Sequence, residues 1–229
     1  PAAAESGKFV DIERVTSPGG IHAWLVTDPS IPVVSVRFAF RGGASLDPAG
    51  LAGLAKMTST LIDEGAGDLD SQTFQRRLLD LSISLRFSAG RDTFSGNMKT
   101  LSKNRDQAFD LLRLALTTPR FDAEPVSRLR SQLLSGLRRD QEDPDVIAGR
   151  TLSEMLFPNH PYGRPVDGTL ASIAAISADD MRAFVTRRLA LDTLYVGVVG
   201  DIDARELGQR LDDVFGALPP KAASFAVAD

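Results

Sequence analysis

The sequence predicts an α+β domain in which helices pack on one face of an antiparallel-rich mixed sheet. In residues 33–40 apolar side chains alternate at period two, the spacing of a strand with one buried face. The segment after Asp122 instead carries apolar side chains at helical spacing. Strand pairs come before helix pairs, and no regular alternation of strand and helix occurs, which favours α+β over a parallel α/β sheet.

The first part of the chain is expected to be mainly extended. Residues 11–27 form two short runs around a turn rich in Pro and Gly. We expect 21–27 and 33–40 to pair as an antiparallel hairpin that opens the sheet. A second hairpin is expected from 83–87 and 93–98.

Helices are expected to follow, and several have N-cap residues. The expected helices are one after Asp47 that stops at 65–67, one from Asp70 or Ser71, 104–117, one from Asp122 to about 143, 145–156, one from Ser177 and one from Asp203. Residues 157–169 are expected to be an ordered loop, and 194–199 a buried strand.

Composition excludes several classes of function. The chain has no cysteine, which removes disulfides, thiol nucleophiles and thiolate metal sites. Its net charge is −4, and Lys and Arg are dispersed among acids along the sequence, so no nucleic-acid partner is expected. No apolar run is long enough to span a membrane. Serine-hydrolase and phosphate-loop motifs do not occur.

Three further groups of polar residues are interpreted as structural. The two histidines, His22 and His160, lie in different segments and do not form a metal-binding pair. One acidic group lacks the spacing of a calcium loop and is interpreted as solvated helix ends and a cap: Asp63, Glu64, Asp68 and Asp70. A group of arginines is interpreted as a solvated helix face with local ion pairs, with a docking surface for an acidic partner or peptide as the alternative: Arg128, Arg130, Arg138 and Arg139.

Four segments, in order and spacing, resemble the N-terminal domain of the M16 metallopeptidase family (pitrilysin/insulinase-like, the inverzincins). They are Arg41-Gly42-Gly43-Ala44-Ser45, Gly50-Leu51-Ala52, residues 157–165 followed by Gly168-Thr169, and residues 176–184 followed by 198–203. The resemblance covers most of the chain. It implies the α+β fold of the M16 and LuxS/MPP-like metallohydrolase domains.

The zinc motif of that family is absent from the corresponding position. Active members carry His-x-x-Glu-His directly after Gly-Leu-Ala: two His on one helix face hold Zn²⁺, the Glu activates water, and a Glu from a later helix completes the ligands. Here these positions are Gly53, Lys56 and Met57, and the later ligand falls at Gly136, or at Ser135 if the register slips by one. Gly has no donor atom, Met is a poor zinc ligand, and Lys56 places a positive charge where the cation would lie. The resemblance therefore predicts no catalytic residue, no metal and no cofactor.

What the resemblance implies is a non-catalytic subunit or domain. Such a chain would pair with a zinc-bearing M16 homologue as a heterodimer, with its own C-terminal domain, or with both, around a peptide-degrading chamber that holds extended peptides. An Arg/Tyr pair that contacts substrate lies in the C-terminal domain of such partners and is not assigned to residues of this chain. Two alternatives stay open: a structural or assembly protein of the same fold, and an active metallopeptidase with an unrecognised site.

The domain organisation follows from the same segments. We expect a flexible start at residues 1–8, one M16-like domain at 9–218, and a linker toward a C-terminal domain at 219–229. The small residues 1–4, without Met, fit a cleaved export signal. A bacterial periplasmic or exported location is therefore expected, with the cytoplasm as the alternative.

Overall fold

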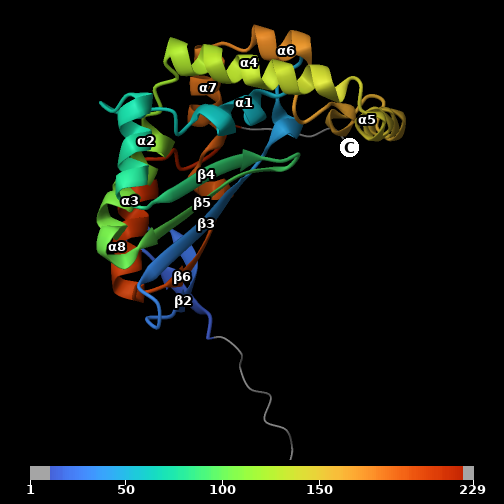
Figure 1. Cartoon of the computed structure of the whole chain (residues 1–229). Coiled ribbons are helices and arrows are strands. Elements are labelled where there is room, and N and C mark those ends of the chain that lie inside the picture. Colours follow the sequence, from blue (N-terminus) through green and yellow to red (C-terminus); the bar gives the residue numbers. More distant parts are fainter. Residues whose placement is uncertain (1–10, 224–229) are drawn as a thin grey trace, which may run out of the picture.

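Six strands form a single mixed sheet in the order β1-β2-β6-β3-β5-β4 (Figure 1). The structure is a computed structural model that describes residues 11–223. Its strands are β1 (Glu13–Thr16), β2 (His22–Thr27), β3 (Val33–Arg41), β4 (Ser84–Ala89), β5 (Thr93–Leu101) and β6 (Leu194–Gly200). All neighbouring pairs are antiparallel except β2 and β6, so the predicted antiparallel-rich mixed sheet is confirmed.

The predicted pairing of 21–27 with 33–40 is wrong, because β6 lies between these two strands. β6 is parallel to β2 and antiparallel to β3. Its residues Val196 and Val198 are buried, so it completes the middle of the sheet from a distant part of the chain. Alternation of apolar side chains at every second residue shows which face of a strand is buried, but not which strand lies beside it. The hairpin of β4 and β5 is confirmed.

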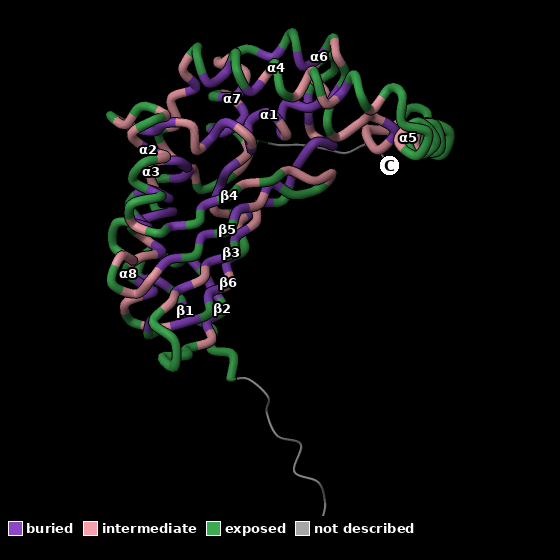
Figure 2. Tube along the Cα trace, viewed as in Figure 1, coloured by how far each residue is buried: buried purple, intermediate pink, exposed green. Residues whose placement is uncertain are grey.

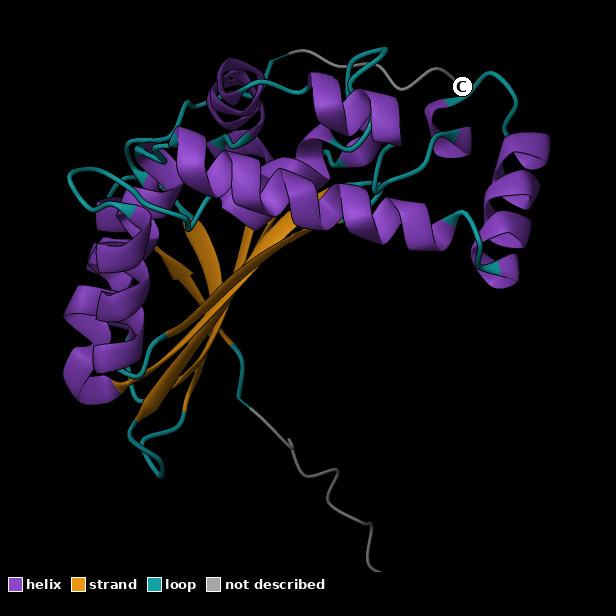
Figure 3. Cartoon of the chain, turned by 45° about the horizontal axis from the view of Figure 1, so that its top comes forward, coloured by secondary structure: helices purple, strands orange, loops and turns teal. Residues whose placement is uncertain are grey.

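The helices lie on one face of this sheet, except α5, which extends beyond it (Figures 1 and 3). They are α1 (Leu54–Leu61), α2 (Ser71–Asp80), α3 (Arg105–Thr117), α4 (Ala123–Asp140), α5 (Pro144–Leu156), α6 (Leu170–Ala175), α7 (Ala178–Arg188) and α8 (Ala204–Phe215). Short 3-10 turns are η1 (Ala44–Leu46), η2 (Ser102–Asn104), η3 (Pro161–Gly163) and η4 (Leu191–Thr193). α3 packs against β5 and α8, while α1 packs against β4, α4 and α7.

The core forms between this helical layer and the inward face of the sheet. The alternating residues of β3 are almost fully buried, as the sequence predicts: Val34, Val36, Phe38 and Phe40. The ring of Phe38 makes edge-on contacts with Phe40, Phe87 and Phe215 at centroid distances of 6.1, 5.9 and 5.7 Å. Burying one such side chain stabilises the fold by about 1.5–3 kcal/mol, so this face anchors the sheet to the helices.

Several helix boundaries follow from caps. The side chains of Asp70 and Asp203 accept backbone N–H bonds at the starts of α2 and α8, and Ser177 with Asp180 forms a capping box for α7, as predicted. Asp122 precedes α4, but its carboxylate accepts a bond from Arg120 (2.7 Å) instead of capping the helix.

Local structure differs from the sequence predictions at several elements. Helix α1 spans only Leu54–Leu61 instead of following Asp47 directly and stopping at 65–67. Helix α6 is not predicted, because its six residues are too few for a helical period to be visible. Helix α4 ends at Asp140 rather than near 143. Strand β6 is buried on one face only, since Tyr195 and Val199 on its other face are 47% and 50% exposed.

Helix α5 stands apart from the main body of the domain (Figures 1 and 2). It contributes no buried residue and packs mainly against η3. The expected flexible start at 1–8 lies outside the described residues, as do residues 224–229 of the expected linker. No helix within 11–223 is long and apolar enough to cross a membrane.

Candidate functional site

The start of α1, where a metal helix is expected to begin, is fixed by a buried carboxylate. The two carboxylate oxygens of Asp47 accept the N–H groups of Gly53 (2.8 Å) and Ala55 (3.0 Å). Arg164, in the loop after α5, donates to the carbonyl oxygens of Asp47 (2.8 Å) and Ser45 (3.2 Å). Burial raises the pKa of Asp47 to about 6, and this outweighs the backbone hydrogen bonds that favour its charged form.

The backbone at Gly53 leaves no room for a side chain. Its φ is +89°, in the left-handed region that favours glycine. A Cβ atom there would lie 2.8 Å from the Ile173 side chain and 2.9 Å from Cα of Gly168. A histidine at this position would therefore need both a different backbone conformation and a displaced neighbour. This explains why α1 begins later than the sequence suggests.

The next two motif positions have opposite environments. Lys56 is partly exposed, and its Nζ lies 3.5 Å from a carboxylate oxygen of Asp167. Met57 is fully buried in the core. The first of these positions therefore holds a cation paired with a carboxylate, and the second histidine position is filled by an apolar side chain.

Gly136 on α4 faces the same region. It lines a small hollow of about 220 Å³ with residues of α1, α4 and the loop before α6, among them Thr60, Asp140 and Asp167. Ser135 is exposed, and its hydroxyl donates to the carbonyl oxygen of Ser131 (2.9 Å). Lys56 and Gly136 thus both lie near Asp167: Lys56 forms an ion pair with it, and Gly136 lines the same hollow. At Gly53 and Met57, in contrast, packing leaves no space for a metal ligand.

These residues do not fit a zinc ion. Glycine offers no donor at two positions, Met57 packs into the core, and the ammonium of Lys56 repels a cation. Within residues 11–223, no three His, Cys, Asp or Glu side chains are grouped so that they could hold a metal. We derive no metal-dependent step for this chain.

Stability measurements can separate the two adjacent positions. Met57→Ala is expected to lower the free energy of unfolding by about 2–5 kcal/mol, because it removes a fully buried side chain. Lys56→Ala should change it by less than about 1 kcal/mol, because the ion pair with Asp167 is solvated. Urea unfolding of the two variants checks this contrast, and equal losses would contradict the packing described for α1.

The histidines have local partners. His22 Nδ1 lies 3.0 Å from the hydroxyl of Thr16, and His160 Nδ1 accepts the N–H of Tyr162 (3.1 Å). The hydroxyl of Tyr162 donates to Asp92 (2.8 Å), which ties the loop to the turn between β4 and β5. The loop at 157–169 is therefore ordered by hydrogen bonds, as predicted.

Some of the acidic and basic residues behave as expected, whereas Glu64 and Arg130 are more buried than a solvated surface predicts. Glu64 pairs with Arg128 at 2.8 Å, and Asp70 caps α2. Arg130 donates to the carbonyl oxygen of Ile176 (2.5 Å). Asp63 is also only partly exposed, and desolvation raises its pKa to about 7. Its position at the end of a buried helix face gives no sequence signal of this.

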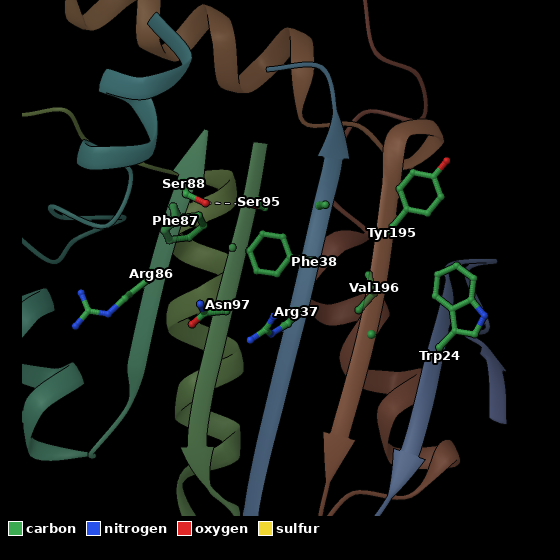
Figure 4. Close-up of a pocket in the computed structure, with 13 residues that line it drawn as sticks. Trp24, Arg37, Phe38, Arg86, Phe87, Ser88, Ser95, Asn97, Tyr195 and Val196 are labelled. Carbon is green, nitrogen blue, oxygen red and sulfur yellow. Dashed lines mark hydrogen bonds between the residues drawn. The ribbon is translucent and has the colours of Figure 1, made fainter. Parts of the chain in front are cut away.

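A larger hollow of about 620 Å³ lies on the sheet face that no helix covers (Figure 4). The side chains of Trp24, Tyr195, Arg37, Asn97 and Arg86 stand around it. The sequence predictions do not identify these residues as a group. Each of them lies next in sequence to an inward-facing residue of its strand, so alternation alone indicates that its side chain faces outward. The order of the strands is also needed to show that the five lie together.

Proteins of similar sequence include one named as a non-peptidase and others named as zinc proteases. No family model matches the chain. It is 29% identical over 189 residues to the protein named non-peptidase homolog YmxG of Helicobacter pylori, covering 82% of this chain and 44% of that protein. It is 25% identical over 223 residues to an uncharacterized zinc protease of Mycobacterium leprae, covering 94% of this chain and 48% of that protein.

The fold also matches solved structures. A crystal structure of a peptidase M16 inactive domain from Pseudomonas fluorescens superposes with a TM-score of 0.88 at 24% identity, over 96% of this chain and 53% of that one. The chain spans about half the length of the curated relatives it matches.

Proposed function

Because the chain is a homologue of the M16 peptidases, we propose that it is a non-catalytic domain that pairs with a zinc-bearing homologue to enclose a peptide. The observation that carries this proposal is the state of α1. Gly53 is closed by its backbone and its neighbours, Lys56 brings a positive charge, and Met57 belongs to the core. The motif positions have thus lost their ligand atoms, and tightly packed neighbours leave no room for a ligand at Gly53 and Met57.

A surface for a second domain supports the pairing. On α5, Leu152, Met155 and Leu156 share one helix face and are 57%, 75% and 63% exposed. Apolar side chains gathered on a helix that stands apart from the domain are characteristic of an interaction surface. The proposed occupant is the zinc-bearing homologue. Among residues 11–223, β4 has a strand on one side only, and its other edge offers a place where an extended peptide could add as a further strand.

The test is co-purification with a homologue that carries an intact His-x-x-Glu-His, with peptide hydrolysis measured for the two proteins together and apart. We expect no hydrolysis by this chain alone and chelator-sensitive hydrolysis by the pair. Hydrolysis by the purified chain alone, abolished by chelator, would show an active metallopeptidase instead. Failure to pair with any zinc-bearing homologue would favour a structural or assembly protein.

The contact surface gives a separate prediction. Glutamate at both Leu152 and Met155 is expected to weaken the pair by about tenfold or more, because it places charge in a desolvated contact. Leu79→Glu is the matched control, since Leu79 on α2 is 78% exposed on the helical side of the domain. Analytical ultracentrifugation checks both. If the two variants pair equally well, α5 is not the contact.

A further inference from the structure

The uncovered face of the sheet carries only one sign of charge. Its outward-facing strand positions hold five cationic residues and no Asp or Glu: Arg14, Arg37, Arg41, Arg86 and Lys99. None of the five forms an ion pair within the described residues, although the charge of Arg86 acts on nearby Asp63 and opposes the rise of its pKa. The chain as a whole has a net charge of −4, so the rest of it is more acidic still.

Strand register places the key residues of this face in one row. Arg14 pairs with Trp24, Trp24 with Gly197, Gly197 with Arg37, Arg37 with Asn97, and Asn97 with Arg86. The row crosses all six strands. With neighbouring strands about 4.8 Å apart it is about 24 Å long, the length of about seven residues of extended peptide.

The row combines apolar and cationic parts (Figure 4). On one side of the hollow stand Trp24 and Tyr195, 51% and 47% exposed, and Gly197 leaves the floor between Trp24 and Arg37 bare. On the other side stand Arg37 and Asn97, while Arg86 extends from β4 past the edge of the sheet (Figure 4). Aromatic rings accept apolar side chains, and guanidinium groups bind carboxylates through paired hydrogen bonds.

We infer that this face binds an acidic peptide segment that also carries an apolar side chain. The inference rests on the proposed function and names the class of peptide that the chamber would receive. Charge complementarity favours a carboxylate-bearing chain over a basic one. A long nucleic acid is disfavoured, because the acidic remainder of the molecule would repel a polyanion that extends beyond the hollow.

The experiment uses the intrinsic fluorescence of Trp24, the only tryptophan of the chain. The probe is an acetylated and amidated peptide, Glu-Ser-Glu-Phe-Glu-Ser-Glu, with a version in which Lys replaces every Glu, and a short oligothymidylate. We expect the acidic peptide to change the emission saturably and the lysine peptide to bind at least about tenfold more weakly. Binding should weaken on going from low salt to about 0.5 M NaCl.

Matched variants identify the residues. Arg37→Gln and Arg86→Gln are each expected to weaken binding by about tenfold, since each removes a charged hydrogen-bond donor. Arg76→Gln on α2, an exposed arginine on the helical side, should leave binding unchanged. Circular dichroism verifies that all three fold, and a labelled peptide read by anisotropy gives a second measurement.

The outcomes are distinct. Equal binding of the acidic and lysine peptides, no binding of either, or unchanged binding by both arginine variants would overturn the inference, as would tighter binding of the oligothymidylate. If this happens while the chain still pairs with a zinc-bearing homologue, the proposed function stands. If acidic peptide binds as expected and pairing fails, the proposed function falls and the binding face stands.

Discussion

Gly53→Ala is expected to destabilise the protein by about 2–5 kcal/mol. A φ of +89° costs a non-glycine residue about 1–2 kcal/mol. The added methyl would also meet Ile173 at 2.8 Å and Gly168 at 2.9 Å, and overpacking of this kind costs about 1–3 kcal/mol. Urea unfolding, followed by circular dichroism, measures the loss.

Gly50→Ala is the matched control. Gly50 has a similar φ of +83°, but no atom lies within 4 Å of the position that its Cβ would take. The control should therefore lose only the conformational part, about 1–2 kcal/mol. The difference between the two variants isolates the close packing. Equal losses would show that α1 starts with room for a side chain.

The same packing limits any restoration of the metal motif. The combined variant Gly53→His, Lys56→Glu, Met57→His and Gly136→Glu should fail to bind stoichiometric zinc and should unfold at lower urea than the wild type. His at Met57 would place a polar ring in an apolar core, and His at Gly53 meets the obstruction described above. Zinc titration with calorimetry checks this, and a folded variant with one tightly bound zinc would refute the packing argument.

Asp47→Asn is expected to remove a pH-dependent contribution to stability. The pKa of Asp47 is about 6 in the folded protein, raised by burial from an ordinary 3.8. Between these values the folded state binds more protons than the unfolded state, so the contribution of Asp47 to stability is greatest below about pH 4 and falls as the pH rises through about 6. The full change is about 3 kcal/mol. The stability advantage of wild type over Asp47→Asn should shrink by about this amount from about pH 4 to about pH 7.

Asp70→Asn should show the opposite trend. Asp70 caps the exposed start of α2, and hydrogen bonds from the backbone and side chain of Thr73 lower its pKa. Its contribution is present above its ordinary pKa and is lost as the pH falls. Urea unfolding of wild type and both variants across this pH range checks the signs. Wild-type and Asp47→Asn curves that run parallel would mean that Asp47 is not held in a buried, desolvated place.

Much of the fold is predictable from local pattern, and the failures have a common physical cause. Alternation identified the inward residues of β3, and caps such as Asp70 and Ser177 located helix starts. The position of β6 was missed, because its pairing with β2 and β3 depends on tertiary packing between distant segments. The row on the uncovered face was missed for the same reason, since it exists only once six strands are placed in order and register.

The resemblance to the family locates the expected motif positions in the sequence, but it does not predict the surroundings of each side chain. Sequence shows that Gly53 has no donor atom, yet only the structure shows that its backbone excludes a replacement. The burial of Asp47 and the partial burial of Asp63 likewise give no sequence signal, because both are short polar residues at helix ends, where solvent exposure is the usual outcome.

The insertion of β6 between β2 and β3 has a consequence for biosynthesis. β2 ends at Thr27 and β6 begins at Leu194, so the middle of the sheet cannot close until nearly the whole domain has left the ribosome. Contacts of such long sequence separation carry a large loop-closure cost before they yield any stabilisation, and they slow folding. The nascent chain therefore holds the apolar faces of its first three strands without their central neighbour for most of translation, a period in which chaperone binding would protect it from aggregation.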